Sequence, residues 1–191
     1  MNNLQVNKAV DFDSLTIDSL RQLKEPELRK NIVIPLLEDY LSAKNVQDLH
    51  GNNEYGIDVY FEWNDIFSHS RNFGVQIKTC DLILRCGSDK NRNIQTICNQ
   101  IKLAFSKKIN FADSSNGKVS KTIDGFYIMT SGKTNDPAKN YIYEERKAYS
   151  YIHIIEGDEL LRIIKNRELL KRSRNKVIIQ SDYSFDIYKL F

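Results

Sequence analysis

The sequence predicts an α/β protein, a sandwich in which helices cover a central mixed β-sheet. Two segments with a period of two, residues 56–63 and 73–80, are joined by a polar stretch, as in a β-hairpin. Amphipathic helical patterns cover residues 14–44 and 94–105, and the nearly continuous apolar segment 125–130 is typical of a strand buried on both faces. The order helix, hairpin, helix, strand, helix, strand, helix predicts this layered architecture.

The first helical region is expected to divide into two helices. Ser14 is placed to cap a short first helix, and Pro26 suits the first turn of the second. Pro35 predicts a kink or a new start, because proline lacks the backbone N–H of a continuous helix. Glu38 lies beside the apolar face, as either a solvated edge residue or a carboxylate directed into a site. That face comprises Leu28, Ile32, Leu36, Leu37, Tyr40 and Leu41.

The predicted hairpin brings polar side chains onto two paired strands. In the first strand, the apolar Ile57, Val59, Phe61 and Trp63 alternate with Asp58, Tyr60 and Glu62. In the second, Phe73, Val75 and Ile77 alternate with Gly74, Gln76 and Lys78. If the register allows, Asp58, Gln76 and Lys78 project together.

The rest of the chain is expected to complete a single domain over residues 1–191. A helix is predicted at 136–149, a strand at 151–155 and a helix at 158–167. A C-terminal segment, 167–191, is expected to add short edge strands at 177–180 and 185–188. Residues 111–122, rich in Ser, Lys and Gly, are expected to be a loop inside this domain.

Composition excludes several classes of protein. The 191 residues are 41% hydrophobic and 28% charged, which is too apolar for a disordered chain. No apolar run approaches the ~20 residues of a membrane span, and the first residues lack a secretory signal pattern. Three unclustered cysteines indicate reduced thiols. We therefore expect a cytoplasmic protein without a membrane partner.

The net charge of +3 is unevenly distributed. Residues 1–65 carry 6 Lys/Arg and 12 Asp/Glu, so the remaining residues carry 22 and 13. An acidic first third joined to a basic remainder suits a metal site beside a phosphate-binding surface. Ordinary fluctuation of charge along a chain is the alternative.

Asp58, Gln76, Lys78 and Glu38 form the informative constellation. Phosphodiester hydrolysis needs an activated water and neutralisation of charge on the phosphate. Carboxylates that hold Mg²⁺ beside a lysine on the neighbouring strand provide both. The Q-x-K spacing puts Gln76 and Lys78 on one face, while the backbone carbonyl of Ile77 is also able to reach a metal.

This arrangement resembles the PD-(D/E)xK nuclease superfamily and, within it, the Mrr-type restriction endonuclease domains. The resemblance covers roughly residues 28–166 and includes G-I-D-V-Y-F at 56–61, G-V-Q-I-K-T at 74–79 and the order of elements that follows. It implies a restriction-endonuclease-like fold. It also implies that Asp58 is the main metal ligand, with Glu38, Gln76 and the Ile77 carbonyl as further ligands, and that Lys78 positions or activates the water.

Two departures from the family pattern stand out. Gln76 occupies the position where many members have Glu, so the site has one negative charge fewer and is expected to bind metal more weakly. The Mrr-like branch accepts Gln there. Ile57 replaces the optional proline before the aspartate, which is also common in the family.

Other motifs give weaker indications. T-S-G-K-T at 130–134 is expected to be a polar turn rather than a phosphate-binding loop, because Tyr127 stands where that loop needs glycine. Lys133 in this turn is a candidate contact to a DNA phosphate. A basic run at 162–176 is either a solvated face or a surface for the DNA backbone, with Lys171, Arg172 and Arg174 as candidate contacts.

The sequence therefore predicts a Mg²⁺-dependent endonuclease, with Mn²⁺ as a substitute, that hydrolyses double-stranded DNA. The resemblance implies a role in restriction or antiviral defence, in which a homodimer or a larger complex would supply two active sites. The first alternative is a catalytically silent nuclease fold that binds DNA or assembles with partners, which the neutral Gln76 favours. The second is a structure-selective nuclease such as a junction resolvase.

Overall fold

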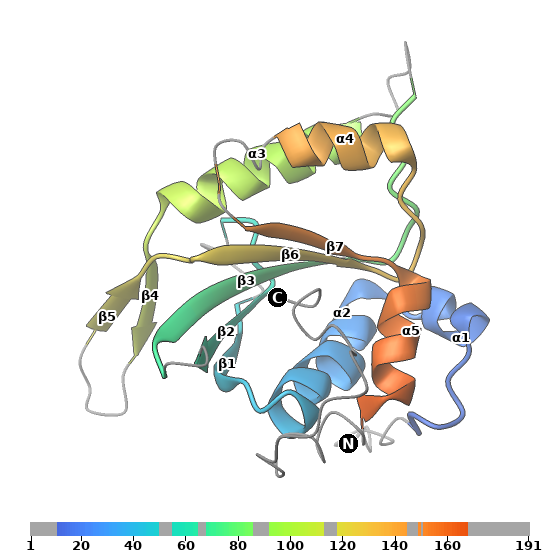
Figure 1. The fold of residues 1–191 in the computed structure, drawn as a ribbon, viewed down its shortest axis with the longest axis horizontal. Helices are drawn as coiled ribbons and strands as arrows, with labels where there is room; N and C mark the ends of the chain where they lie inside the picture. Colours follow the sequence, from blue (N-terminus) through green and yellow to red (C-terminus); the bar gives the residue numbers. More distant parts are fainter. Residues whose placement is uncertain are drawn as a thin grey trace, which may run out of the picture.

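A five-stranded mixed β-sheet with helices on both faces forms the centre of the computed structural model (Figure 1). The structure describes residues 11–49, 55–64, 68–85, 92–112, 118–144, 149 and 151–167. The strand order is β1-β2-β3-β6-β7. The strands span Lys44–Asp48 (β1), Val59–Asn64 (β2), Ser70–Lys78 (β3), Gly125–Thr130 (β6) and Ile152–Ile155 (β7). The predicted α/β class with a mixed central sheet is confirmed.

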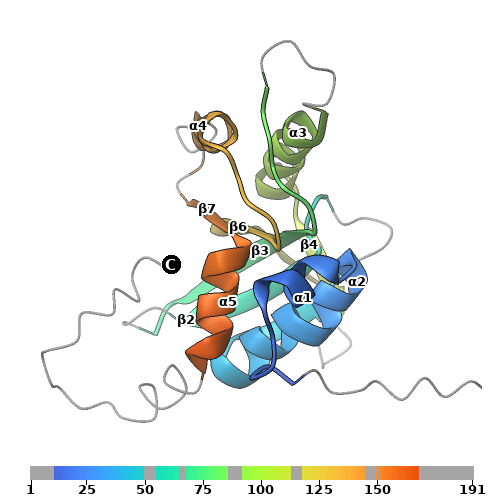
Figure 2. The same ribbon diagram turned by 90° about the vertical axis from the view of Figure 1, so that its right-hand side faces the viewer.

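The helices are divided between the two faces of the sheet. Helices α3 (Arg92–Ser106) and α4 (Asp136–Glu144) cover one face, while α1 (Ile17–Gln22), α2 (Glu25–Leu28) and α5 (Gly157–Lys165) cover the other (Figures 1 and 2). Strand β3 pairs with β6 and β6 with β7 in parallel, so each pair needs a crossover connection. Because both crossovers step in the same direction along the sheet, α3 and α4 lie on the same face.

Strands β2 and β3 form the predicted antiparallel hairpin, with Val59 opposite Val75 and Asn64 opposite Ser70. All six residues of β6 are buried, which confirms the prediction for residues 125–130. Two apolar cores result. One packs β2, β3 and β6 against α2 and α5, and the other packs the opposite face against α3 and α4.

Residues 25–40 form one continuous helical stretch, in which α2 leads into two π-helical segments, η1 (Arg29–Val33) and η2 (Leu36–Tyr40). Pro26 lies in the first turn of α2, as predicted. Pro35 adopts helical dihedrals between the π segments, so the predicted new start is wrong. The wider π turns make room for a ring that would crowd the preceding turn of an α-helix. The predicted apolar face is confirmed, with Leu28, Ile32, Leu36 and Leu37 buried.

Several predicted boundaries are wrong. Thr16, not Ser14, caps the first helix, because Thr16 and Ser19 each bond the other's backbone N–H. β1 was not predicted; its residues are mostly polar and its burial pattern does not alternate. The predicted loop at 111–122 includes parts of an antiparallel pair, β4 (Ile109–Ala112) and β5 (Lys118–Lys121). The edge strands predicted at 177–180 and 185–188 lie outside the described residues.

A polar cluster fastens β5 to the central sheet. The Tyr60 hydroxyl lies 2.9 Å from a Glu62 carboxylate oxygen and 2.8 Å from Asn72 Oδ1, and Lys121 of β5 forms an ion pair with Glu62. Burial opposes ionisation of Glu62, but hydrogen bonds from Lys121, Asn45 and Tyr60 outweigh it and lower the pKa of Glu62 below its ordinary 4.5. The folded state therefore favours the ionised carboxylate.

This cluster predicts a pH-dependent contribution to stability. A carboxyl group whose pKa is lowered by folding stabilises the protein above its unfolded pKa, and that contribution is lost as the pH falls through the folded pKa. We expect Glu62→Gln to lower the melting temperature at neutral pH. The difference in melting temperature between this variant and the wild type should shrink once the pH falls below 4.5. Thermal unfolding at a series of pH values measures this difference.

Lys121→Met is the matched control for this experiment. It removes the cationic partner of Glu62. In the Lys121→Met background, the change in melting temperature caused by Glu62→Gln should therefore depend less on pH. A difference between wild type and Glu62→Gln that stays constant from neutral to acid pH would contradict the assignment.

Candidate functional site

Asp58 lies at a β-bulge immediately before β2. Its backbone N–H donates to the Val75 carbonyl at 2.8 Å, although Val59 is the register partner of Val75. Two residues of one strand thus oppose one residue of the other, which reverses the alternation of side chains before the bulge. Ile57 consequently packs in the core under α3, whereas Val59 packs in the core under α2. The prediction that both share a face is wrong.

The Asp58 carboxylate is held against the backbone of β3. Its Oδ2 accepts a hydrogen bond from the Ile77 N–H at 2.6 Å, and the side chain is only 9% exposed. The Asp58 carbonyl also accepts from the Leu49 N–H at 2.9 Å, which ties the bulge to the end of β1. Backbone groups on both neighbouring strands therefore set the position of this carboxylate.

The Ile77 carbonyl is directed to the same side of β3 as the Asp58 carboxylate. Within a strand, the N–H and C=O of one residue point toward the same neighbour and those of the next residue toward the opposite one. The Ile77 N–H points to Asp58, whereas the Lys78 carbonyl accepts from Ser131 beyond β6. The Ile77 carbonyl therefore points to the same side of β3 as the Asp58 carboxylate that accepts from the Ile77 N–H.

Gln76 is directed to the layer of helix α3. Its side chain is 2% exposed, and its Nε2 donates to Oε1 of Gln100 in the middle of that helix. Gln76 Oε1 has no hydrogen-bond partner among the described residues. A buried acceptor without a donor costs about 1–3 kcal/mol, and an amide oxygen is a suitable ligand for Mg²⁺. This orphaned atom fits a cation in a way that an apolar or donor group would not.

Lys78, the last residue of β3, reaches the start of helix α2. Its Nζ lies 3.3 Å from Oε1 of Glu25, the first residue of α2. The structure thus brings Asp58 and the backbone of Ile77 together, with Gln76 and Lys78 on either side of Ile77. The sequence placed Gln76 and Lys78 on one face of the strand, and β3 pairs with β6 without a break from Phe73 to Lys78, so both side chains leave the strand on the same face. Their ends diverge, because Gln76 contacts Gln100 on α3 whereas Lys78 contacts Glu25 on α2.

The helix carboxylate beside Lys78 is Glu25 and not Glu38. Glu38 is exposed on η2, which packs beside β1. Glu25 and Glu38 are 13 positions apart, which corresponds to roughly 15–20 Å along a helix. The sequence did not predict a role for Glu25. An acidic residue in the first turn of a helix is common, because it complements the helix dipole. Only the packing of α2 against the end of β3 places it at the site.

The predicted basic contacts have different surroundings. Lys133 is 65% exposed and lies 3.4 Å from Asp158. In the run at 162–176, Lys165 bonds the Asp13 carbonyl, and Arg167 is buried against the Phe12 ring and Asp13, so these two residues hold the N-terminal segment. Lys171, Arg172 and Arg174 lie outside the described residues.

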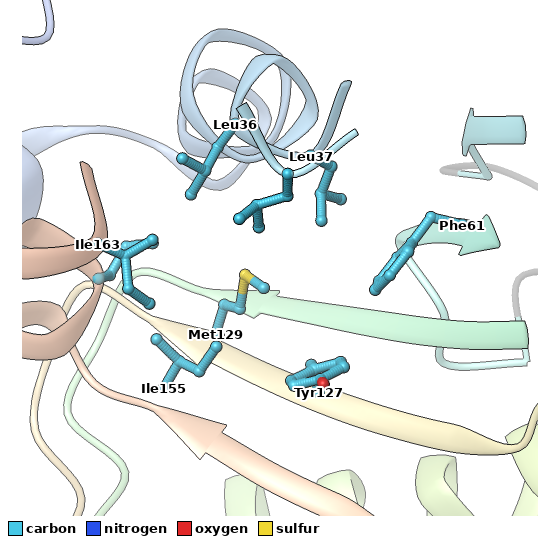
Figure 3. Close-up of a pocket in the computed structure, with 9 residues that line it drawn as sticks. Leu36, Leu37, Phe61, Tyr127, Met129, Ile155 and Ile163 are labelled. Carbon is cyan, nitrogen blue, oxygen red and sulfur yellow. The ribbon is translucent and has the colours of Figure 1, made fainter. Parts of the chain in front are cut away.

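An apolar pocket lies away from this constellation. It is enclosed by η2, α5 and the face of the sheet beneath them, where Leu36, Leu37 and Ile163 converge on Phe61, Tyr127, Met129 and Ile155 (Figure 3). None of these side chains carries a charge, so the pocket offers no charged partner to a phosphate or a metal ion. The end of the hairpin that holds Asp58, Gln76 and Lys78, here called the polar end of the hairpin, is the better candidate for chemistry.

No group of three or more His, Cys, Asp or Glu side chains among the described residues is arranged to hold a metal. The candidate ligands that the sequence predicted at the hairpin are instead one carboxylate (Asp58), one amide oxygen (Gln76) and one backbone carbonyl (Ile77). No helix in the described part of the chain is long and apolar enough to cross a membrane.

Comparisons with family models, curated proteins and solved structures found no match.

The hydrogen bond from Ile77 to Asp58 predicts different effects of two substitutions. Asp58→Ala leaves the buried Ile77 N–H without this acceptor and should lower the free energy of unfolding by about 1–3 kcal/mol. Asp58→Asn retains an acceptor oxygen and should retain most of the stability. Urea denaturation of both variants measures the difference.

Asp39→Ala, which removes an exposed carboxylate on η2, is the control and should change stability by no more than about 0.5 kcal/mol. If Asp58→Ala and Asp58→Asn were equally stable, the hydrogen bond would not be what holds the Asp58 carboxylate.

Proposed function

We propose that this chain is a metal-dependent nuclease of the PD-(D/E)xK type that hydrolyses phosphodiester bonds in double-stranded DNA. The observation that carries the proposal is the hydrogen bond that holds the Asp58 carboxylate on the backbone of Ile77, next in sequence to Gln76, whose buried Oε1 has no hydrogen-bond partner among the described residues. Oxygen ligands of these three kinds suit Mg²⁺ or Mn²⁺. The preference for DNA and a role in restriction or antiviral defence follow from the sequence resemblance.

The residues present fit a divalent cation. Asp58, Gln76 and the Ile77 carbonyl would hold it, and the cation would supply a more acidic water and neutralise charge on the phosphate. Asp58 is already fixed by the Ile77 N–H, so little side-chain freedom is lost on binding. The neutral Gln76 leaves the site with one formal negative charge near the hairpin, which favours weaker binding than a pair of carboxylates gives.

Lys78 supplies the positive charge of the proposed site. It lies at the end of β3 and is about one quarter exposed, so its ammonium group is able to contact a phosphate oxygen or orient a water. Glu25 holds the ammonium group in place through the 3.3 Å contact. A phosphate would compete with Glu25 for Lys78, and the released carboxylate would then be available to accept a proton or a hydrogen bond.

A catalytically silent DNA-binding or assembly module is the second candidate. The observation that favours it is the absence, among the described residues, of a cluster of three ionisable metal ligands. The neutral Gln76 points in the same direction. In such a protein, the Lys78–Glu25 pair would fasten α2 to the sheet and would have no chemical role.

Cleavage of plasmid DNA separates these candidates. With Mg²⁺ or Mn²⁺ present, we expect nicking or linearisation that EDTA abolishes and that Lys78→Ala reduces by roughly 100-fold or more. DNA binding should largely survive in this variant, since one phosphate contact among several is lost. Lys30→Ala removes an exposed lysine from η1 and is the matched control, with activity expected near the wild-type level.

Metal-independent cleavage, or equal activity in Lys78→Ala and Lys30→Ala, would reject the proposed site. DNA binding that is sensitive to salt, without cleavage in either metal, would support the silent module. Competition between branched and linear DNA then distinguishes a junction nuclease from an enzyme that cuts linear duplexes.

The two helix carboxylates predict opposite outcomes. Glu25 contacts Lys78, whereas Glu38 lies 13 positions, or about three to four helical turns, further along the same helical stretch. We expect Glu25→Ala to reduce cleavage by roughly 10-fold or more through loss of the partner that positions Lys78. Glu38→Ala should leave cleavage nearly unchanged. A loss of activity in Glu38→Ala with none in Glu25→Ala would restore the role that the sequence pattern assigned to Glu38.

A further inference from the structure

The middle of helix α3 contacts both sides of the candidate site through one residue. Gln100 accepts the hydrogen bond from Gln76 Nε2. It also packs against Gly56, which has a φ of +82° and precedes Asp58 by two residues; a methyl group at Gly56 would overlap the Cβ of Gln100. The turn that leads into Asp58 and the side chain of Gln76 thus share a single neighbour on α3.

The bond between the two glutamines determines which end of the Gln76 amide faces the site. A primary amide carries its donor and its acceptor on opposite branches of one plane. With Nε2 engaged by Gln100, Oε1 lies on the other branch of the amide, and this buried oxygen has no hydrogen-bond partner in the described part of the chain. Rotation of the amide by half a turn would present an NH₂ group, which repels a cation.

We propose that Gln100 is a positioning residue that locks the Gln76 amide with its oxygen directed at the cation. The inference rests on the proposed function, because it assumes that Gln76 is a metal ligand. It adds a reason why glutamine works at this position: a carboxylate presents an acceptor in either orientation, whereas an amide needs a neighbour that accepts. Gln100 Oε1 is that acceptor.

The test measures Mn²⁺ affinity by isothermal titration calorimetry on the full chain, in the absence of DNA. Gln100→Ala keeps the Cβ that packs on Gly56 but removes the acceptor, and we expect it to weaken Mn²⁺ binding by roughly 10–100-fold, as loss of a partner to a metal ligand commonly does. Gln100→Glu, which is only able to accept, should retain or increase the affinity. Gln95→Ala, which removes an exposed glutamine earlier on α3, is the matched control and should bind as the wild type does.

A second background separates orientation from general disruption of the fold. In Gln76→Glu the ligand no longer needs to be oriented, so adding Gln100→Ala should change the Mn²⁺ affinity by no more than about twofold. An equal loss in both backgrounds would show that Gln100 only supports the local structure and would overturn the inference. Unchanged affinity in Gln100→Ala alone would overturn it as well, while leaving the nuclease proposal in place.

Failure of the proposed function gives a different result. If the wild type and Gln76→Glu both bind no Mn²⁺, the metal site and the role of Gln100 are rejected together. Thermal unfolding of each variant in EDTA confirms that the compared proteins are folded.

Discussion

The central position of strand β3 is the constraint on which the rest of the structure depends. It pairs in antiparallel fashion with β2 and in parallel with β6, and each face of the sheet is covered by helices. Residues 73–77 of β3 are buried as a result. A polar side chain in such a strand must find a partner in the helical layers, because an unpaired buried polar group costs about 1–3 kcal/mol. Gln76 does so with one end of its amide only.

The polar end of the hairpin depends on a local exception to sheet geometry. The bulge at Asp58 stops the ladder one residue early and exposes the Ile77 N–H and carbonyl to a side chain instead of a strand. Asp58 then satisfies the N–H. The same hydrogen bond that compensates for the interrupted ladder also fixes a carboxylate beside a backbone carbonyl, so structural and proposed chemical roles meet in one residue.

The apolar pocket and the charged side chains of the candidate site lie in different parts of this fold. The apolar pocket lies beneath η2 and α5 and is lined by aliphatic and aromatic side chains, one of which, Tyr127, pairs through its hydroxyl with Tyr151. The charged groups gather at the end of β3, where α2 begins and the hairpin strands separate. The Glu62–Lys121 pair at the other end of the hairpin fastens β5, and thus contributes to stability at a distance from the proposed chemistry.

The sequence by itself determined the features that depend on backbone periodicity. The alternation in β2 and β3, the continuous apolar β6 and the buried face of the 25–40 helix follow from periods of two and 3.6, which are local properties of strand and helix. Tertiary structure decided what those periods do not encode. Lys78 and Glu25 are 53 residues apart in sequence, and Gln76 and Gln100 are 24 apart, yet both pairs are in contact. Their meeting depends on where each helix packs along the sheet, and the bulge that turns Asp58 toward Ile77 is likewise set by the pairing of two strands rather than by either alone.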